Sequence, residues 1–131
     1  MSKPSVSEVA VAFAGAAGHH DLSALAQWIA DDFIFRVPGK NPLSGERRGL
    51  QGLLEFLDAT QKLTTGHIKT EVLDLLIGQD YAALYTRTQA QRPDRPALDN
   101  PSLMLLKISD GKVHEAWSHN RDQAAVDAFW S

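Results

Sequence analysis

The amino-acid sequence predicts one α+β domain in which helices and a curved antiparallel sheet enclose a small-molecule pocket. Three observations favour this fold class. Helical hydrophobic spacing occupies the first half of the chain and its very end. The second half carries four long strand-like segments separated by turns. The chain has 131 residues, of which 44% are hydrophobic and 22% charged, which is typical of a single globular domain.

Two short helices are predicted at the start of the chain. Ser5 and Glu8 stand at the spacing of a capping box, and apolar residues follow at helical spacing until Gly18. Asp21 can cap a second helix, whose apolar residues lie on one face as far as Ile29. Each helix therefore has one apolar face to bury.

A short strand and a third helix come next. The Asp31–Asp32 pair ends the second helix, and residues 33–37 form a β-rich run that Pro38–Gly39 stops. Residues 39–45 are predicted to form a loop because they are rich in Gly, Asn, Pro and Ser. The leucines at positions 50, 53, 54 and 57 then form the apolar stripe of a third helix.

The second half of the chain predicts four strands and a closing helix. The strands are residues 67–77, 81–91, 97–108 and 112–119. Ser109–Asp110–Gly111 is a hairpin turn, and Asn120 is predicted to cap the final short helix. The order α-α-β-α-β-β-β-β-α places an antiparallel sheet against the early helices. Strands of this length twist strongly, so the sheet should curve around the helices and leave an open end.

Composition and charge exclude several classes of function. The chain has no cysteine, which excludes disulfides, thiolate metal sites and cysteine nucleophiles. The net charge is −3 and no basic stripe is present, so nucleic acid is not an expected partner. The first ten residues lack an apolar signal core, and no run approaches the ~20 apolar residues of a membrane span. We therefore expect a cytoplasmic protein with no membrane partner.

No motif for a metal or a cofactor is found in the sequence. His114 and His119 are five residues apart, so a regular strand would point them to opposite faces. The run HEAWS lacks the second histidine of the zinc motif, and neither a nucleophile elbow nor a phosphate-binding glycine loop occurs. We expect neither a metal nor a cofactor.

Three stretches resemble the SnoaL-like (polyketide-cyclase-like) family of the nuclear-transport-factor-two-like superfamily. They are residues 30–57, with an aspartate, an aromatic strand, Pro-Gly and an Arg-Gly-helix pattern, residues 108–120, with an Asp-Gly-Lys turn and Glu-x-Trp, and the closing helix 122–130. The resemblance spans about the whole chain, so residues 1–131 are expected to form one SnoaL-like domain. It implies a cone-shaped α+β barrel with an interior cavity, usually as a homodimer. It does not fix the reaction, because this fold hosts cyclases, isomerases, dehydratases, epoxide hydrolases and binding proteins.

The last predicted strand supplies the first candidate catalytic residue. Regular alternation puts Val113, Glu115, Trp117 and His119 on one face. Because Val113 and Trp117 favour burial, we expect Glu115 and His119 to point into the cavity or its mouth. His119 could act there as a general acid or base, since the histidine pKa lies near neutrality. The alternative is a rim histidine with a satisfied hydrogen bond.

Tyr85, Arg87 and Gln89 share one face of another strand and are the second set of candidates. Arg87 would bind an anionic or carbonyl oxygen of a substrate, and Tyr85 would donate a hydrogen bond to it. An equally weighted alternative is an ion pair between Arg87 and Glu115. The limonene-epoxide-hydrolase branch carries an acid at the position of Gln89, so this departure disfavours epoxide hydrolysis.

The pocket wall is predicted from the same strands and from the third helix. The predicted lining is Phe35, Arg36, Leu43, Leu57, Gln89, Met104, Glu115 and Trp117. The alternation of the first strand leaves open whether Phe35 or Arg36 points inward.

Three functions follow from these predictions. The first is a small-molecule enzyme that resembles SnoaL-like cyclases and isomerases, with His119 moving a proton on a small, mainly apolar carbonyl-type substrate. The second is a non-catalytic ligand-binding or accessory protein with the same cavity, which the missing carboxylate at Gln89 favours. The third is a structural homodimer that uses the outer face of the sheet.

Overall fold

The computed structural model describes residues 3–19 and 21–131 of the chain, and these form helices and strands in the order expected of an α+β fold. The helices are α1 (Val6–Gly18), α2 (Leu22–Trp28), α3 (Gly49–Thr64) and α4 (Gln123–Trp130). The strands are β1 (Ile29–Val37), β2 (Gly45–Arg48), β3 (Ile68–Ile77), β4 (Tyr81–Ala90), β5 (Leu98–Ser109) and β6 (Lys112–Asn120).

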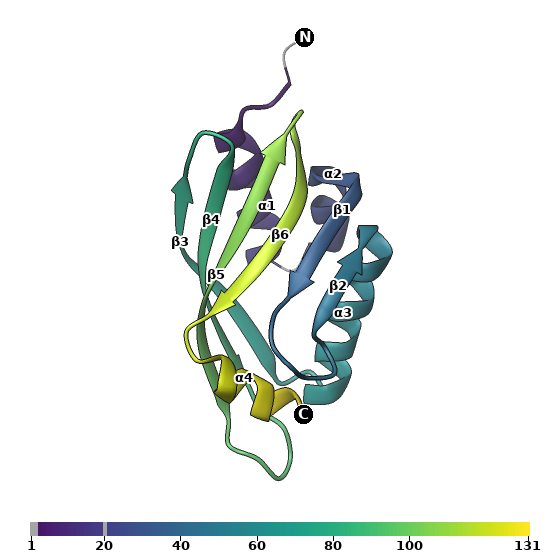
Figure 1. Cartoon of the computed structure of the whole chain (residues 1–131), viewed down its shortest axis with the longest axis vertical. Coiled ribbons are helices and arrows are strands. Elements are labelled where there is room, and N and C mark those ends of the chain that lie inside the picture. Colours follow the sequence, from purple (N-terminus) through teal and green to yellow (C-terminus); the bar gives the residue numbers. More distant parts are fainter. Residues whose placement is uncertain (1–2, 20) are drawn as a thin grey trace.

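All the strands belong to one curved sheet with the order β2-β1-β6-β5-β4-β3. Every neighbouring pair is antiparallel except β1 and β6, which run parallel. Figure 1 shows α1 and α3 behind the sheet, with α1 against its β3–β5 half, α3 beside β1 and β2, and α4 at the opposite end from α2. The predicted α+β class, with the N-terminal helices packed on a curved, largely antiparallel sheet, is confirmed.

Local signals located the helix starts well. The capping box of Ser5 and Glu8 is present, and the Asp21 side chain accepts a hydrogen bond from the amide of Ala24. The N-cap of α4 is Asp122 and not the predicted Asn120, which is the last residue of β6. No helix among the described residues combines the length and hydropathy needed to cross a bilayer.

The structure adds one strand that the sequence did not predict. Residues 45–48, Gly-Glu-Arg-Arg, pair antiparallel with β1 and form the edge strand β2. A charged segment has low β propensity, but charges are common on edge strands because they discourage pairing with another chain. β1 also begins earlier than predicted, at Ile29, and contains the Asp31–Asp32 pair.

Irregularities of the sheet decide which side chains face the helices. In β6 the register moves from Lys107–Glu115 to Ile108–Val113, which leaves His114 as an extra residue. Such a β-bulge shifts the alternation of the strand by one residue. Val113 and, beyond the bulge, Ala116 are therefore both buried on the inner face, the face toward the helices.

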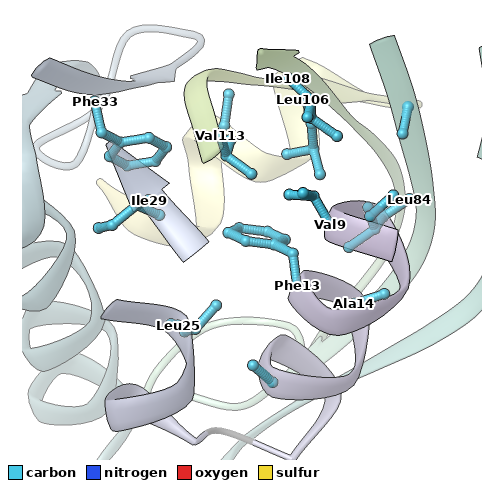
Figure 2. Packing of buried hydrophobic residues seen from close by; sticks show 14 of the residues in the cluster. Val9, Phe13, Ala14, Leu25, Ile29, Phe33, Leu84, Leu106, Ile108 and Val113 are labelled. Carbon is cyan, nitrogen blue, oxygen red and sulfur yellow. The ribbon is translucent and has the colours of Figure 1, made fainter. Parts of the chain in front are cut away.

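A cluster of apolar side chains fills the end of the molecule near α1 and α2. Figure 2 shows Phe13 of α1 at its centre, with Val9 beside it and Val113 and Leu106 of the sheet opposite. A second cluster closes the other end: Leu43, Ala90 and Leu98 pack there with Val126, Phe129 and Trp130 of α4. Between these two clusters the inner face of the sheet carries polar side chains, among them Thr86, Thr88 and Ser102.

Candidate functional site: a cavity between the sheet and the helices

A cavity of about 600 Å³ lies between the two apolar clusters. Its lining includes Phe13 of the first cluster and Trp130 of the second, so one cluster bounds each end. The volume falls in the range of about 300–1,000 Å³ that is usual for small-molecule sites.

Apolar side chains from the helices and from the sides of the sheet form most of the cavity wall. The apolar lining residues are Phe13, Ala17, Leu22, Leu25, Phe35, Val37, Pro38, Leu43, Leu53, Leu54, Phe56, Leu57, Ile68, Val72, Leu84, Leu98, Met104, Val126 and Trp130. Phe35 and Phe56 meet edge to face with ring centroids 5.0 Å apart, which fixes both rings in the wall.

The centre of the sheet contributes hydroxyl and amide groups to this wall. We call this group the polar band; it consists of Thr70, Thr86, Thr88, Asn100, Ser102, Ser118 and Asn120. The band is continuous across four strands, because Thr88 is paired with both Thr70 and Asn100, and Ser102 with both Thr86 and Asn120. It therefore offers hydrogen-bonding groups without formal charge.

Among the described residues that line the cavity, Asp58 is the one with an ionisable side chain. Its carboxylate is largely exposed and lies 2.8 Å from the ammonium group of Lys62, one helical turn further along α3. An exposed i, i+4 pair of this kind is a surface feature. The interior of the cavity is accordingly uncharged.

A chain of side-chain hydrogen bonds leads from the polar band to α4. The Asn100 side-chain amide donates to Asn120 Oδ1 at 2.9 Å, and Asn120 donates to Gln123 Oε1 at 2.8 Å. Gln123 in turn donates to Asp127 Oδ1 at 3.0 Å. The same oxygen accepts from the Asn41 side chain at 2.7 Å and from the Lys40 amide at 3.0 Å. These bonds tie α4 to the β1–β2 loop and so fix the end of the cavity that α4 covers.

Two arginines hold the last turn of α4. Arg92 and Arg95, in the β4–β5 loop, donate to the carbonyl oxygen of Phe129 at 2.6 and 2.8 Å. The Arg92 guanidinium also lies 6.0 Å from the centroid of the Phe129 ring. Cations at the C-terminal end of a helix bind its free carbonyls and interact favourably with the negative end of its dipole.

The residues predicted for the site divide between the two faces of the sheet. Phe35, Leu43, Leu57 and Met104 line the cavity. The others project from the outer face, the face of the sheet turned away from the helices; they are Arg36, Tyr85, Arg87, Gln89, Glu115, Trp117 and His119. The predicted catalytic group is thus not brought to the cavity, and the open question about the first strand is answered, with Phe35 inward and Arg36 outward.

The bulge at His114 is the physical reason for this correction in β6. The prediction assumed unbroken alternation from the buried Val113, which would have carried Glu115, Trp117 and His119 inward. The extra residue turns Ala116, Ser118 and Asn120 inward instead. His114 itself lies 3.0 Å from Asp32 Oδ1 and 3.1 Å from the carbonyl oxygen of Ser109.

On the outer face the charged residues have partners of their own. Arg87 binds Asp99 through two hydrogen bonds of 2.8 and 2.7 Å, and the guanidinium holds the pKa of that carboxyl below its usual value. The predicted Arg87–Glu115 pair is therefore replaced by Arg87–Asp99. Glu115 instead lies 3.5 Å from the guanidinium of Arg36, on the neighbouring strand β1.

The polar band was missed although the sequence carries a signal for it. In β4 the residues at 82, 84, 86, 88 and 90 are Ala, Leu, Thr, Thr and Ala, whereas the alternate face holds the arginine and both tyrosines. In β5 the even positions from 98 to 108 are likewise uncharged, whereas Asp99 and Lys107 stand at odd positions. A face free of charge along a whole strand is the better indicator of the interior.

No group of three or more His, Cys, Asp or Glu side chains placed to hold a metal ion occurs within residues 3–19 and 21–131.

Comparisons with known proteins agree with this architecture. The family model described as SnoaL-like domain matches residues 10–116. The uncharacterized protein Rv0034 of Mycobacterium tuberculosis is 30% identical over 113 residues, which is 85% of each chain. A Xanthomonas campestris protein described as having a cystatin-like fold superposes with a TM-score of 0.86, at 26% identity, over 98% of this chain and 99% of its own. An NTF2-like protein from Burkholderia xenovorans superposes with a TM-score of 0.77, at 16% identity, over 100% and 99%.

Proposed function

The chain belongs to the SnoaL-like domain family, and we propose that it binds a small, uncharged, mainly apolar molecule in its cavity. The observation that carries this proposal is the composition of the wall, in which apolar side chains surround the uncharged polar band. Apolar surface supplies the affinity of such a site, and a few placed polar groups orient the ligand.

The same observation favours binding over acid–base turnover. Proton transfer in a cavity needs a titratable group within about 3 Å of the reacting atom, or one water molecule away. Asp58 is the one titratable side chain among the described lining residues, and it lies at the exposed surface, paired with Lys62. The candidates His119, Arg87 and Tyr85 lie on the other side of the sheet. Any catalysis in this cavity would therefore depend on restricting a reactive substrate to a productive conformation and not on proton transfer by a side chain.

Thermal-shift measurements with a matched pair of compounds test the proposal. We expect 2-naphthol to raise the melting temperature of the protein, because a ligand that binds the folded state stabilises it by mass action. The carboxylate of 2-naphthoate, with nearly the same ring system, should produce no shift at pH 7, since the cavity offers no cation to offset its desolvation.

A pair of variants locates the binding. Met104→Trp should fill the cavity and abolish the 2-naphthol shift, whereas Leu103→Trp, the adjacent residue on the outer face, should leave it intact. Equal shifts by the two compounds, or equal effects of the two variants, would contradict the proposal.

We also propose that the outer face of the sheet mediates self-association into a homodimer. Ile34, Tyr85, Leu103, Leu105 and Trp117 form a partly exposed apolar patch, defined here as the outer patch. Four of these residues are joined by strand pairing, Leu103 with Tyr85 and Leu105 with Trp117, and Ile34 lies diagonally from Trp117 on β1. The Arg87–Asp99 and Arg36–Glu115 pairs lie at its sides. An apolar centre with a charged rim is the usual composition of a protein–protein interface.

A further inference from the structure

The hydrogen-bonded chain from Asp127 to Asn100 has a direction that its chemistry determines. An ionised carboxylate can only accept hydrogen bonds, so Gln123 must turn its NH₂ group toward Asp127. The Oε1 of Gln123 is then left to accept, and it does so from Asn120 Nδ2. Asn120 Oδ1 is left in the same way and accepts from Asn100 Nδ2. Each amide in the chain is therefore oriented by the one before it.

Two further contacts fix the orientation of Asp127, the residue at which this series of hydrogen bonds begins. The Oδ1 of Asn41 accepts a hydrogen bond from the Leu43 amide at 2.9 Å, so its Nδ2 is free to donate to Asp127. The backbone amide of Lys40, which can only donate, reaches the same carboxylate oxygen. Asp127 is thus surrounded by donors, which is an environment suited to the charged form.

The chain ends in the cavity with an unused acceptor. Asn100 lies on the inner face of β5 and is 9% exposed. Its Nδ2 is engaged by Asn120, and no donor among the described residues reaches its Oδ1. No fully buried side-chain N or O atom lacks a hydrogen bond among the described residues, so this oxygen is reached from the cavity, where a ligand that supplies a donor can bond to it.

We propose that Asn100 Oδ1 selects ligands that present a hydrogen-bond donor, an O–H or N–H group, to the middle of the polar band. This inference rests on the proposed binding function and narrows its ligand class to neutral, mainly apolar molecules with a hydroxyl or N–H group. The hydroxyls of Ser102 and Ser118 do not share this selectivity, because a hydroxyl can donate or accept as the ligand requires. The side-chain amide of Asn100, which is oriented by the hydrogen bonds that begin at Asp127, distinguishes ligands that present a donor from those that present an acceptor.

Three bicyclic probes of nearly equal shape test the selection. Indole carries an N–H donor, benzofuran an oxygen acceptor and indene a CH₂ group at the same position. Binding of each to the full-length, uniformly ¹⁵N-labelled protein is measured by ¹H–¹⁵N NMR titration, with the backbone amides of Thr86 and Ser102 as reporters of the cavity. We expect indole to bind about three- to tenfold more tightly than benzofuran or indene, the range that one additional hydrogen bond provides.

Variants assign the preference to the chain of amides. Asn100→Leu should reduce the preference for indole to about twofold or less, while indene binding persists. Gln123→Leu removes the acceptor that orients Asn120, so Asn120 and Asn100 can reverse together, and the preference should fall without preventing binding. Gln89→Leu is the matched control, since it removes an exposed side-chain amide from the outer face of the sheet, and the preference should remain.

The outcomes separate this inference from the function on which it rests. Equal binding of the three probes, tighter binding of benzofuran, or a preference that survives Asn100→Leu would overturn the role of Asn100 and leave the binding proposal standing. Loss of the preference in Gln89→Leu would likewise overturn it. If no probe shifts the reporter amides, the binding proposal fails and this inference fails with it. Should Asn100→Leu not fold, the ranking in the unmodified protein and in Gln123→Leu decides.

Discussion

A single carboxylate oxygen joins two parts of this molecule that are far apart in the chain. Asp127 Oδ1 accepts hydrogen bonds from Asn41, Gln123 and the Lys40 amide, and so connects α4 to a loop more than 80 residues away in the chain. The approach is so close that a Cβ atom on Gly39 would lie 2.2 Å from this oxygen, and Gly39 has a φ of +93°. Glycine is the residue that permits both the backbone conformation and the contact.

The donors around Asp127 make a prediction about pH. The hydrogen bond from Asn41, with those from Gln123 and the Lys40 amide, lowers the pKa of this carboxyl below its ordinary value of about 3.9. A lowered folded-state pKa means that the stabilisation is fully present above the unfolded value and is lost as the pH falls through the folded one. We therefore expect Asp127→Asn to reduce the free energy of unfolding at pH 7 and to do so progressively less below about pH 4.

Urea unfolding of the wild type and of Asp127→Asn at pH 7, 5 and 3 measures this difference. The comparison at each pH cancels the titration of the other carboxyl groups, because both proteins share them. A gap between the two proteins that stays constant or widens toward pH 3 would show that the charge of Asp127 does not stabilise the fold.

At the scale of the elements, the sequence predicted those features whose signals are local. The capping box at Ser5 and the hairpin turn at Asp110 depend on residues within a few positions of one another, and both are present. The first strand and the third helix were predicted from a β-rich run and from the leucine stripe, which are also short-range patterns. The fold class followed from the order of these elements.

The features that escaped prediction depend on contacts between distant residues. β2 is a strand only because β1 is available to pair with it. The bulge at His114 arises where β6 must match both β5 and β1, and a one-residue shift there exchanges the two faces of the strand. Four of the predicted lining residues lie in the wall, but the bulge placed the predicted chemistry of β6, at Glu115 and His119, on the other face. The chain of amides to Asp127 likewise joins residues that no local pattern connects.

Adjacent residues of β6 test the position of the bulge. Ala116 is 1% exposed on the inner face, whereas Trp117 is half-buried on the outer face. We expect Ala116→Asp to cost at least about 3 kcal/mol, because it buries an unpaired carboxylate. Trp117→Ala should cost under about 1.5 kcal/mol, well below the 3–5 kcal/mol typical of a core tryptophan.

Chemical denaturation at submicromolar protein concentration, where association is minimal, provides both values. A large loss for Trp117→Ala together with a small loss for Ala116→Asp would restore the unbroken alternation and remove the bulge from the account.

At the scale of the whole molecule, the two faces of one sheet have different chemistry. The part of the inner face that lines the cavity is uncharged, and Arg47 of the edge strand β2 lies beside it over the Phe56 ring. The outer face combines the apolar outer patch with ion pairs. Strand alternation lets both sets of side chains occupy the same strands without conflict. A ligand in the cavity and a partner on the outer face would therefore be separated by the thickness of the sheet alone.

The outer patch makes a prediction about the assembly of the protein. Leu103 is 43% exposed at the centre of the patch. If this surface joins two copies, each Leu103 is buried on association, and Leu103→Asp should place an unpaired charge in the interface and shift the protein to monomer. Val11→Asp is the matched control, because Val11 is 58% exposed on α1, on the other side of the sheet. Sedimentation velocity at 1–100 μM measures the outcome, with the wild type and Val11→Asp expected to sediment as dimers. A monomeric wild type over this range, or a dimer that persists in Leu103→Asp, would rule out this face as the interface.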